Sequence, residues 1–474
     1  MRRILLAGVA VVVTACGVQE MFTGDAGAVA RTATAELRRD TLAAIMVGGK
    51  NVPLEREMVE RWAFRWVEFS LFAERLAAGD SLLDSTTVIA AMWPEANQWL
   101  VNAFHEQLAN ERVHVDSAVV DSAYAAGDHR LIQHILIRTT PDMSPPARTT
   151  AERRAEAIRA RLAAGGSWEA DNEQSDDPVA KQEGGSLGVI VRGQRPKAFD
   201  DAAFALAPGE LSRPVATQYG LHIIRRPPLD EVRDAYTAAV TEILTARMRE
   251  DYLGELDTLR NLRVRSNGPA LMREAAQAPL RTYQSPRVIG TYRGGEFTTA
   301  DFVHWLQALR SDVAQSVPGA SDDQLEELAR SLIRNETLIR EAHEAGMVLT
   351  ADDMRDLRER LREEIDRVTS TVGLDSAMAG LPTVEERQAA GEAAIRDYFH
   401  RISGRLSTVV VVPPFLAEML RSTMEWDVSQ PGVDQTLELA TRLREERLEP
   451  EGVAPQTPAP QTPVPDTTGG SGAR

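Results

Sequence analysis

Two short apolar segments, each with a histidine, limit the possible folds of this chain more than any other feature. They are Gln133-His134-Ile135-Leu136-Ile137 and Gly220-Leu221-His222-Ile223-Ile224, far apart in the sequence. Each histidine precedes an apolar pair or triple, which is typical of a short buried strand. If the two strands pair, their imidazoles face each other across one small cleft. The sequence therefore predicts a unit of mixed strands and helices in the middle of the chain, with a candidate site inside it.

The length and composition of the chain limit its architecture and its partners. A chain of 474 residues is too long for one compact core, so two or more domains are expected. Aromatic residues make up only 5%, while Ala, Leu, Glu and Arg are abundant, which favours helices. The formal net charge of −17 argues against a nucleic-acid partner, because phosphate binding needs clustered Lys and Arg.

The N-terminus predicts export and a lipid anchor. The basic start Met1-Arg2-Arg3 precedes an apolar run, and Thr14-Ala15-Cys16 follows. This order predicts a signal peptide over residues 1–15, too short to span a bilayer. Cys16 is the sole cysteine, so no intramolecular disulfide is possible. The stretch Val13–Cys16 resembles a bacterial lipobox, which implies that Cys16 becomes a lipidated N-terminus on the periplasmic side of a membrane. The alternative is an ordinary signal peptide that happens to carry a cysteine.

The flanks of the mixed unit carry helical patterns. Apolar residues recur at helical spacing from Leu54 to Ala78, and helices are expected to continue to Ala126. The pattern resumes over Leu229–Leu262, and irregular sequence follows to about Thr291. The later predicted helices are Phe302–Leu309, Leu325–Ala345, Met354–Val368, Val384–Ser403 and Pro414–Met424. Beyond Glu449 the chain is rich in Pro, Thr, Gly and Gln, which predicts disorder.

A weak internal echo connects the two helical flanks. Ser70–Gly79 resembles Thr337–Gly346, and a Gly-Gly pair precedes each of them by some distance. Helices that end in Ala-Gly are common, so chance is one explanation. If the echo is real, two related helical units flank the mixed segment.

A series of spaced motifs runs through residues 129–226. Besides the two histidine segments it contains Ser175-Asp176-Asp177-Pro178, Gly184-Gly185-Ser186-Leu187-Gly188, Ala203-Phe204-Ala205-Leu206 and Pro208-Gly209-Glu210. The series resembles the parvulins, a family of peptidyl-prolyl cis/trans isomerases. The resemblance implies an α+β fold, in which a parvulin domain with a small antiparallel sheet and surrounding helices is inserted between helical, chaperone-like segments.

The expected division of the chain follows from these patterns. It is a signal peptide at 1–15, a lipidated tether at 16–46, an N-terminal helical segment at 47–127, the parvulin domain at 128–227, a C-terminal helical segment at 228–448 and a disordered tail at 449–474.

The resemblance also implies the site. His134 and His222 match the two central histidines of the family, and Thr217 matches the threonine of their hydrogen-bond network. Asp177 stands where the family has Asp or Cys beside the substrate carbonyl. The residues expected to bind the substrate are Leu187, Gln194, Arg195 and Phe199. Arg195 departs from the family, because the pocket there usually holds a methionine.

The implied chemistry is physically reasonable. Rotation about an X-Pro amide faces a barrier of ~20 kcal/mol because conjugation is lost. Lowering it needs an apolar slot for the ring and polar groups suited to the twisted amide, with no covalent step and no cofactor. Two bonded imidazoles beneath the slot would fix each other's tautomers.

Other interpretations of these residues stay open. The histidine pair is also compatible with a satisfied core network, and Asp177 with a cap at the turn before Pro178. A zinc site is disfavoured, because no cysteine is available and no further ligand has suitable spacing to either histidine.

The helical flanks resemble, more loosely, the chaperone arms of extracytoplasmic parvulin foldases. This implies a membrane-anchored foldase whose partners are unfolded or proline-containing polypeptides. The Trp, Phe, Met and Leu stripes of the flanks also fit an ordinary core. The alternative function is a holdase chaperone whose parvulin domain is catalytically inactive.

Overall fold

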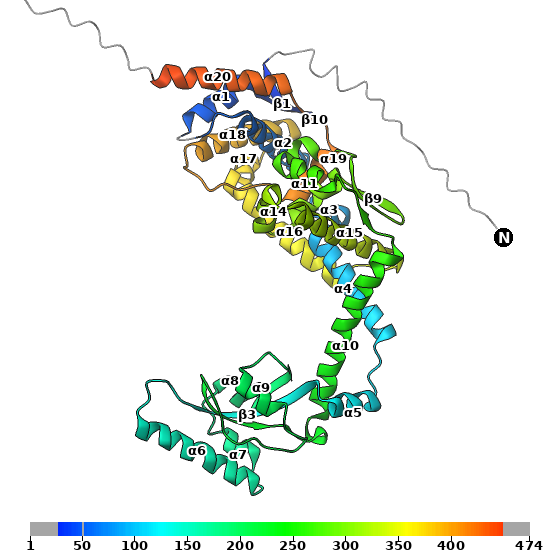
Figure 1. Cartoon of the computed structure of the whole chain (residues 1–474). Coiled ribbons are helices and arrows are strands. Elements are labelled where there is room, and N and C mark those ends of the chain that lie inside the picture. The colour runs from blue at the N-terminus through cyan, green and yellow to red at the C-terminus, as the bar shows by residue number, and fades with distance from the viewer. Residues whose placement is uncertain (1–26, 50–51, 449–474) are drawn as a thin grey trace, which may run out of the picture.

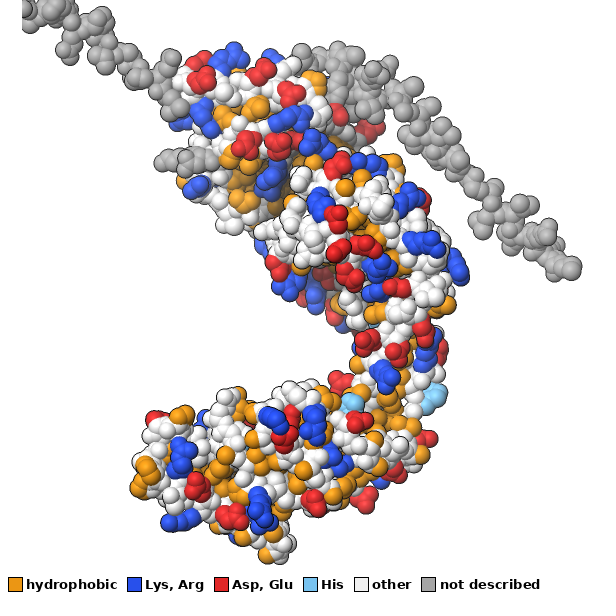
Figure 2. Space-filling model, in the orientation of Figure 1, with side chains coloured by type: hydrophobic (Ala, Val, Ile, Leu, Met, Phe, Trp, Pro, Cys, Tyr) orange, Lys and Arg blue, Asp and Glu red, His pale blue; other side chains and the backbone are white. Residues whose placement is uncertain are grey.

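The computed structural model describes residues 27–49 and 52–448. The predicted signal peptide, Cys16 and the predicted tail at 449–474 lie outside the described residues. The chain forms a helical body and a smaller lobe of strands and helices, which two segments connect (Figure 1). The connecting segments contain α4 (Trp93–Arg112) and α5 (Ser117–Ala126) on the way out, and α10 (Leu229–Leu259) on the way back. The space-filling view shows an open hollow between the lobes (Figure 2). Within the described ranges, no helix combines the length and the apolar character needed to cross a bilayer.

The smaller lobe contains a four-stranded antiparallel sheet in the order β4-β3-β6-β5. Its strands are β3 (His129–Arg138), β4 (Ser186–Val191), β5 (Val215–Thr217) and β6 (Gly220–Arg225). In the pairing of β3 with β6, His134 is opposite Ile224 and Leu136 is opposite His222. Because residues two apart on a strand share a face, this register puts both histidines on the same face of the sheet.

Helices cover both faces of this sheet. Behind the histidines, α6 (Pro145–Ala163) and α7 (Trp168–Asn172) enclose a core with Ile135, Ile137 and Ile223. On the histidine face, α9 (Lys197–Ala203) packs Phe199 and Ala203 against Ile132, Ile190 and Ile224. The short α8 (Pro178–Gln182) lies beside β3 and β4. The α+β class predicted from the sequence is confirmed.

The two ends of the smaller lobe meet where α5 and α10 touch. Tyr124 of α5 and Tyr236 of α10 pack edge to face with ring centroids 4.8 Å apart. The buried guanidinium of Arg226 lies 4.8 Å from the Tyr124 ring and donates to the carbonyls of Tyr124 and Leu206. The lobe is therefore inserted into the body at one point, where the outgoing and returning chains touch.

The helical body has a large core that both flanks of the chain build together. Phe69 of α2 (Arg56–Ala78) packs against Tyr398 and Phe399 of α18 (Val384–Ser403), with centroids 5.4 and 6.0 Å away. The other contributors are α1 (Arg39–Gly48), α3 (Ser85–Ala91), α16 (Ala351–Val372), α17 (Leu374–Met378), α19 (Pro414–Thr423) and α20 (Gln430–Leu448). The segments 47–127 and 228–448, which we predicted as separate parts, thus share one core.

The prediction of a tether over residues 16–46 is wrong from Ala28 onward. Residues Ala28–Thr32 form β1, the central strand of a sheet in the order β10-β1-β2, with β2 at Glu36–Arg38 and β10 at Trp426–Val428. Val29 and Ala30 are fully buried. The weak periodicity there reflects strands too short to show a pattern, because β2 has only three residues.

The region predicted to be irregular up to Thr291 is also structured. A third sheet joins β7 (Arg263–Val264), β8 (Val288–Tyr292) and β9 (Gly295–Thr298). It packs with α11 (Gly268–Gln277), α12 (Pro279–Thr282), α13 (Thr299–Ala308), α14 (Ser311–Ser316), a 3₁₀ turn at Val317–Gly319 and α15 (Asp322–Glu344). The long predicted helices are confirmed, with small shifts of their ends.

The internal echo has a structural counterpart. Ser70–Gly79 and Thr337–Gly346 lie at the ends of α2 and α15, and both helices have 23 residues. A β-hairpin and a ten-residue helix precede each of these helices, β1-β2-α1 before α2 and β8-β9-α13 before α15; α14 and the 3₁₀ turn at Val317–Gly319 are inserted in the second case. The shared order and lengths favour two related units over chance.

Candidate active site

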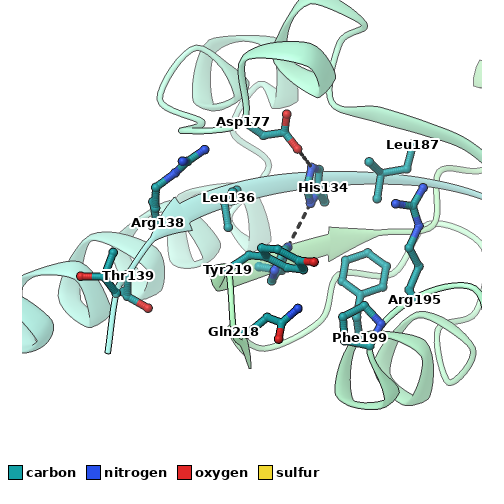
Figure 3. A pocket seen from close by; sticks show the side chains of 13 residues that line it. His134, Leu136, Arg138, Thr139, Asp177, Leu187, Arg195, Phe199, Gln218 and Tyr219 are labelled. Atoms are coloured by element: carbon teal, nitrogen blue, oxygen red, sulfur yellow. Dashed lines mark hydrogen bonds and ion pairs between the residues drawn. The ribbon is translucent and has the colours of Figure 1, made fainter. Parts of the chain in front are cut away.

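A cavity of about 450 Å³ opens on the histidine face of the four-stranded sheet (Figure 3). Its wall includes six of the predicted site residues and seven others. The lining residues are His134, Leu136, Arg138, Thr139, Thr140, Asp177, Leu187, Arg195, Pro196, Phe199, Gln218, Tyr219 and His222. The cavity therefore gathers residues from β3, from the start of α8 and β4, from α9 and from the β5–β6 turn.

A continuous chain of hydrogen bonds forms the floor of this cavity. Asp177 Oδ2 lies 3.0 Å from His134 Nε2, and His134 Nδ1 lies 3.1 Å from His222 Nδ1. His222 Nε2 lies 2.8 Å from Thr217 Oγ1, which accepts the Tyr219 backbone N–H at 3.1 Å. All four imidazole nitrogens are therefore engaged, and the two rings lie nearly parallel with centroids 5.3 Å apart.

One set of donors satisfies this chain when Asp177 is ionised. The carboxylate only accepts, so His134 Nε2–H donates to it and His134 Nδ1 is left as an acceptor. His222 Nδ1–H then donates to His134, and the Thr217 hydroxyl donates to His222 Nε2. The chain thus holds two neutral imidazoles in defined tautomers, because any other assignment leaves a pair of donors or a pair of lone pairs facing each other.

The electrostatics of the site agree with this assignment. Burial lowers the pKa of His134, and this effect exceeds the opposite effect of the nearby Asp177 carboxylate. Burial also lowers the pKa of His222 to about 4, and His134 contributes in the same direction. Burial alone would raise the pKa of Asp177, but hydrogen bonds from Ala180 and the contact with His134 outweigh it, so this pKa is lowered. Near neutral pH the floor carries one carboxylate and two uncharged rings.

Asp177 has two structural tasks at once. Its Oδ1 accepts the backbone N–H groups of Val179 and Ala180, both at 3.1 Å, and so caps the N-terminus of α8. Its Oδ2 points to His134. The capping role that the sequence left as an alternative is therefore real, and it aims the second oxygen at the histidine pair.

The Gly-Gly-Ser-Leu-Gly motif explains how β4 reaches the site. Gly185 has φ +84°, and a Cβ there would lie 3.0 Å from both the His134 carbonyl oxygen and the Trp168 ring. The His134 N–H donates to the Gly185 carbonyl at 2.7 Å. Only glycine permits this conformation and this close approach. The turn then brings Leu187, two residues later, to the cavity wall.

Phe199 closes the apolar side of the cavity. Its ring is 2% exposed and meets the His222 and His134 rings edge-on, with centroids 5.2 and 6.1 Å away. Pro196 directly precedes α9 and lines the same wall. Together with Leu187 the ring forms a slot of apolar carbon above the polar floor.

The other predicted residues take different places. Thr217 is not part of the wall but holds His222 through its hydroxyl. Arg195 lines the cavity rim, whereas Gln194 does not reach it, because its Oε1 accepts the Val191 backbone N–H at 3.2 Å.

Some wall residues were missed from the sequence. Leu136 was predictable, since it stands two residues after His134 on one strand and shares its face. Arg138, Thr139, Gln218 and Tyr219 lie at strand ends and turns, where no periodicity marks the direction of a side chain. Among the residues that the structure describes, no group of three or more His, Cys, Asp or Glu is arranged to hold a metal ion.

Comparison with known families identifies this lobe. Residues 134–227 match the family described as rotamase, PPIC-type PPIase domain. The lobe is a parvulin-type domain. The resemblance predicted from the motifs is thus confirmed for about a fifth of the chain.

Related proteins match the same part of the chain. Chaperone SurA of Chromohalobacter salexigens is 40% identical over 124 residues, which cover 25% of this chain and 28% of that relative. Foldase protein PrsA of Caldanaerobacter subterraneus subsp. tengcongensis is 43% identical over 88 residues, covering 17% of this chain and 29% of that relative. The chain thus spans less than a third of the length of these curated relatives. The crystal structure of PrsA from Bacillus subtilis aligns with 28% identity and a TM-score of 0.21, covering 31% of this chain and 56% of that chain.

Proposed function

We propose that this protein is a peptidyl-prolyl cis/trans isomerase and chaperone that assists the folding of polypeptides outside the cytoplasm. The observation that carries the proposal is the continuous hydrogen-bond chain Asp177–His134–His222–Thr217 beneath an apolar slot. Such a floor has no free nucleophile, but it presents one fixed negative charge and two oriented neutral rings. This suits a reaction that only rotates a bond.

The catalytic step follows from the charges in an amide. Planar conjugation places negative charge on the carbonyl oxygen, and the twisted transition state loses that charge. A proline ring held between Leu187 and Phe199 would direct the preceding carbonyl toward Asp177. The carboxylate then disfavours the planar amide relative to the twisted one, since only the planar form builds up charge facing it. The histidine pair keeps Asp177 in place and ionised.

Isomerisation of short X-Pro peptides by the protein lacking residues 1–16 tests the enzymatic proposal. We expect acceleration that Phe199→Leu reduces, because leucine keeps the wall apolar but removes the ring face. Val179→Ala is a matched control, since Val179 is 72% exposed on α8 and outside the cavity. If neither the full protein nor the isolated domain accelerates any X-Pro peptide, the enzymatic proposal fails.

The second candidate function is a holdase whose parvulin-type domain is inactive. In that case the helical body would be the part that binds unfolded clients. The relatives are named a chaperone and a foldase, while the body outside residues 128–227 has its own core. Because α5 and α10 touch where the domain is inserted, a short Gly-Ser linker can replace residues 128–227. Suppression of client aggregation by this shortened protein supports holding by the body, and its loss assigns holding to the domain.

Lipid anchoring at Cys16 is part of the proposal. The sole cysteine follows an apolar run at a small-residue boundary, which supports a lipidated N-terminus on the periplasmic side of a membrane. Cys16→Ser should move the protein from the membrane fraction to the soluble fraction. An intact mass that shows an unmodified N-terminus at another residue contradicts this.

A further inference from the structure

Two guanidinium groups stand at opposite ends of the cavity. Arg195 comes from the loop between β4 and α9, beside Leu187 and Phe199, while Arg138 comes from the end of β3 (Figure 3). Both side chains are exposed to solvent. Any peptide that lies along the cavity would therefore pass close to a positive charge at each end.

Arg195 makes fewer polar contacts than Arg138. Among the described residues it has no ion-pair or hydrogen-bond partner, whereas the neighbouring Arg192 faces Asp201 at 3.6 Å and lies 4.6 Å from the Phe204 ring. Arg138 donates to the backbone carbonyl of Asp176 at 3.2 Å. The field of Arg195 reaches the floor, since it adds to burial in lowering the pKa of His134.

Among the described residues, the cavity holds two cations and one carboxylate, that of Asp177. Asp177 is its sole acidic lining residue within the described part of the chain, and its two oxygens already accept from Val179, Ala180 and His134. The domain also differs in charge from the rest of the chain. Residues 128–227 contain 14 Lys and Arg and 13 Asp and Glu, whereas the whole chain contains 53 and 70. An acidic peptide is therefore repelled less by the domain than by the remainder of the protein.

We propose that the cavity prefers prolines with an acidic residue directly beside them, and that Arg195 determines this preference. The inference rests on the proposed isomerase function and names the substrate class of the same site. A guanidinium at the rim adds a charge-assisted contact that an apolar wall residue cannot make. Because the group is exposed, the effect is moderate: roughly three- to ten-fold in kcat/KM between an acidic and a basic neighbour.

The test compares tetrapeptides that carry Glu, Leu or Lys on either side of proline. For each peptide, kcat/KM for isomerisation is measured with the protein lacking residues 1–16. The measurement is made at low salt and in ~1 M NaCl, where the Debye length falls to about 3 Å. We expect Glu to exceed Leu and Leu to exceed Lys at low salt, with the differences collapsing at high salt. Arg195→Gln should remove the order, and Arg195→Lys should keep most of it. Arg192→Gln loses the same charge outside the cavity and should leave the order unchanged.

Failures of the two proposals look different. Equal kcat/KM for all three peptides, or an order that Arg195→Gln does not alter, overturns the preference and leaves the isomerase standing. If no peptide is isomerised, the proposed enzyme fails, and binding of fluorescein-labelled acidic and basic peptides is compared by anisotropy. Tighter, Arg195-dependent binding of the acidic peptide then supports the preference, and equal binding overturns it.

Discussion

His134 in the parvulin-type domain and His304 in the helical body each bond to a carboxylate, yet their surroundings differ. His134 Nε2 lies 3.0 Å from Asp177, and its side chain is 4% exposed and backed by a second imidazole. His304 Nδ1 lies 2.9 Å from Glu418, with a side chain that is 26% exposed. It packs edge-on against Trp93 and Phe415, with centroids 4.4 and 5.0 Å away. The first pair is the start of a closed polar chain, while the second joins helices from distant parts of the body.

The difference shows how the two lobes use buried polar groups. In the domain, burial dominates and lowers the pKa of both histidines, so the network is uncharged apart from Asp177. In the body, burial alone would raise the pKa of Glu418, but His304 and Gln307 hydrogen-bond to it and lower that pKa. In the domain the polar groups form a cavity floor with defined protonation states. In the body they hold α13 against α19.

Separating the lobes should produce the largest effect. Residues 128–227 should fold alone, because their sheet, helices and two cores belong to the lobe itself. Residues 228–448 alone should not fold cooperatively, since their core needs Phe69 and other residues of α1 and α2. Calorimetry of the two fragments measures this. A cooperative transition in the second fragment, or none in the first, breaks the comparison.

Removing one aromatic ring from each lobe should separate stability from binding. Phe399 is fully buried and packs against Trp62 and Phe69, so Phe399→Ala should lower the free energy of unfolding by about 3–5 kcal/mol. The kcat/KM for proline peptides should stay unchanged in the folded protein. Phe199→Ala should weaken proline-peptide binding by on the order of 2 kcal/mol, through the lost ring face. Denaturant titration and peptide binding, measured on both variants, test these two expectations. Weaker peptide binding by Phe399→Ala would contradict the separation of stability from binding.

Acidification should weaken the domain before it weakens the Glu418 pair. The folded pKa of His222 is about 4 against an ordinary value of 6.5, so the unfolded chain binds the proton more readily. Stability is therefore full above pH 6.5 and falls as the pH drops toward 4, by up to about 3 kcal/mol. The contribution of Glu418, whose pKa is lowered, is present above its usual pKa of 4.5 and is lost only below that value.

Unfolding of the isolated domain, followed between pH 7 and pH 4, checks this window. His222→Asn should flatten the decline, because asparagine does not titrate. A domain whose stability stays constant over this range would show that the histidines are solvated rather than held neutral.

Six of the residues that line the cavity could be placed from the sequence because their motifs have local causes. Gly185 must be glycine where β4 approaches His134, and Asp177 must be a short acceptor at the N-terminus of α8. Such requirements leave a trace at fixed positions in the sequence. Gln194 shows the limit of such predictions. It stands at the motif position expected to bind substrate, but its amide oxygen accepts the Val191 backbone N–H and does not reach the cavity.

The body was predictable only in its long helices. The Val384–Ser403 helix shows a clear apolar period and a Thr383–Glu386 capping box. Strand β1, in contrast, is central in its sheet because it pairs with the neighbouring β2 and also, through Ala30, with the distant Val428. No local pattern reveals such a partner. The shared core of the two flanks was missed for the same reason, since Phe69 and Phe399 are neighbours only in the folded chain.

The smallest expected effect concerns the end of the hydrogen-bond chain. Thr217→Val keeps the shape of the side chain but removes the hydroxyl that donates to His222 Nε2. The acceptor on the buried His222 is then left without its protein partner, at a cost of about 1–2 kcal/mol in domain stability. Thr241→Val on the exposed face of α10 is the matched control, because its hydroxyl only bonds back to Thr237 of the same helix. Isomerisation should slow modestly in Thr217→Val alone, since the His222 tautomer loses its restraint while Asp177 keeps its own contacts. If both variants unfold at the same denaturant concentration as the parent protein, the Thr217 hydroxyl does not restrain the histidine pair, and the domain resembles the body in holding a histidine through its carboxylate contact.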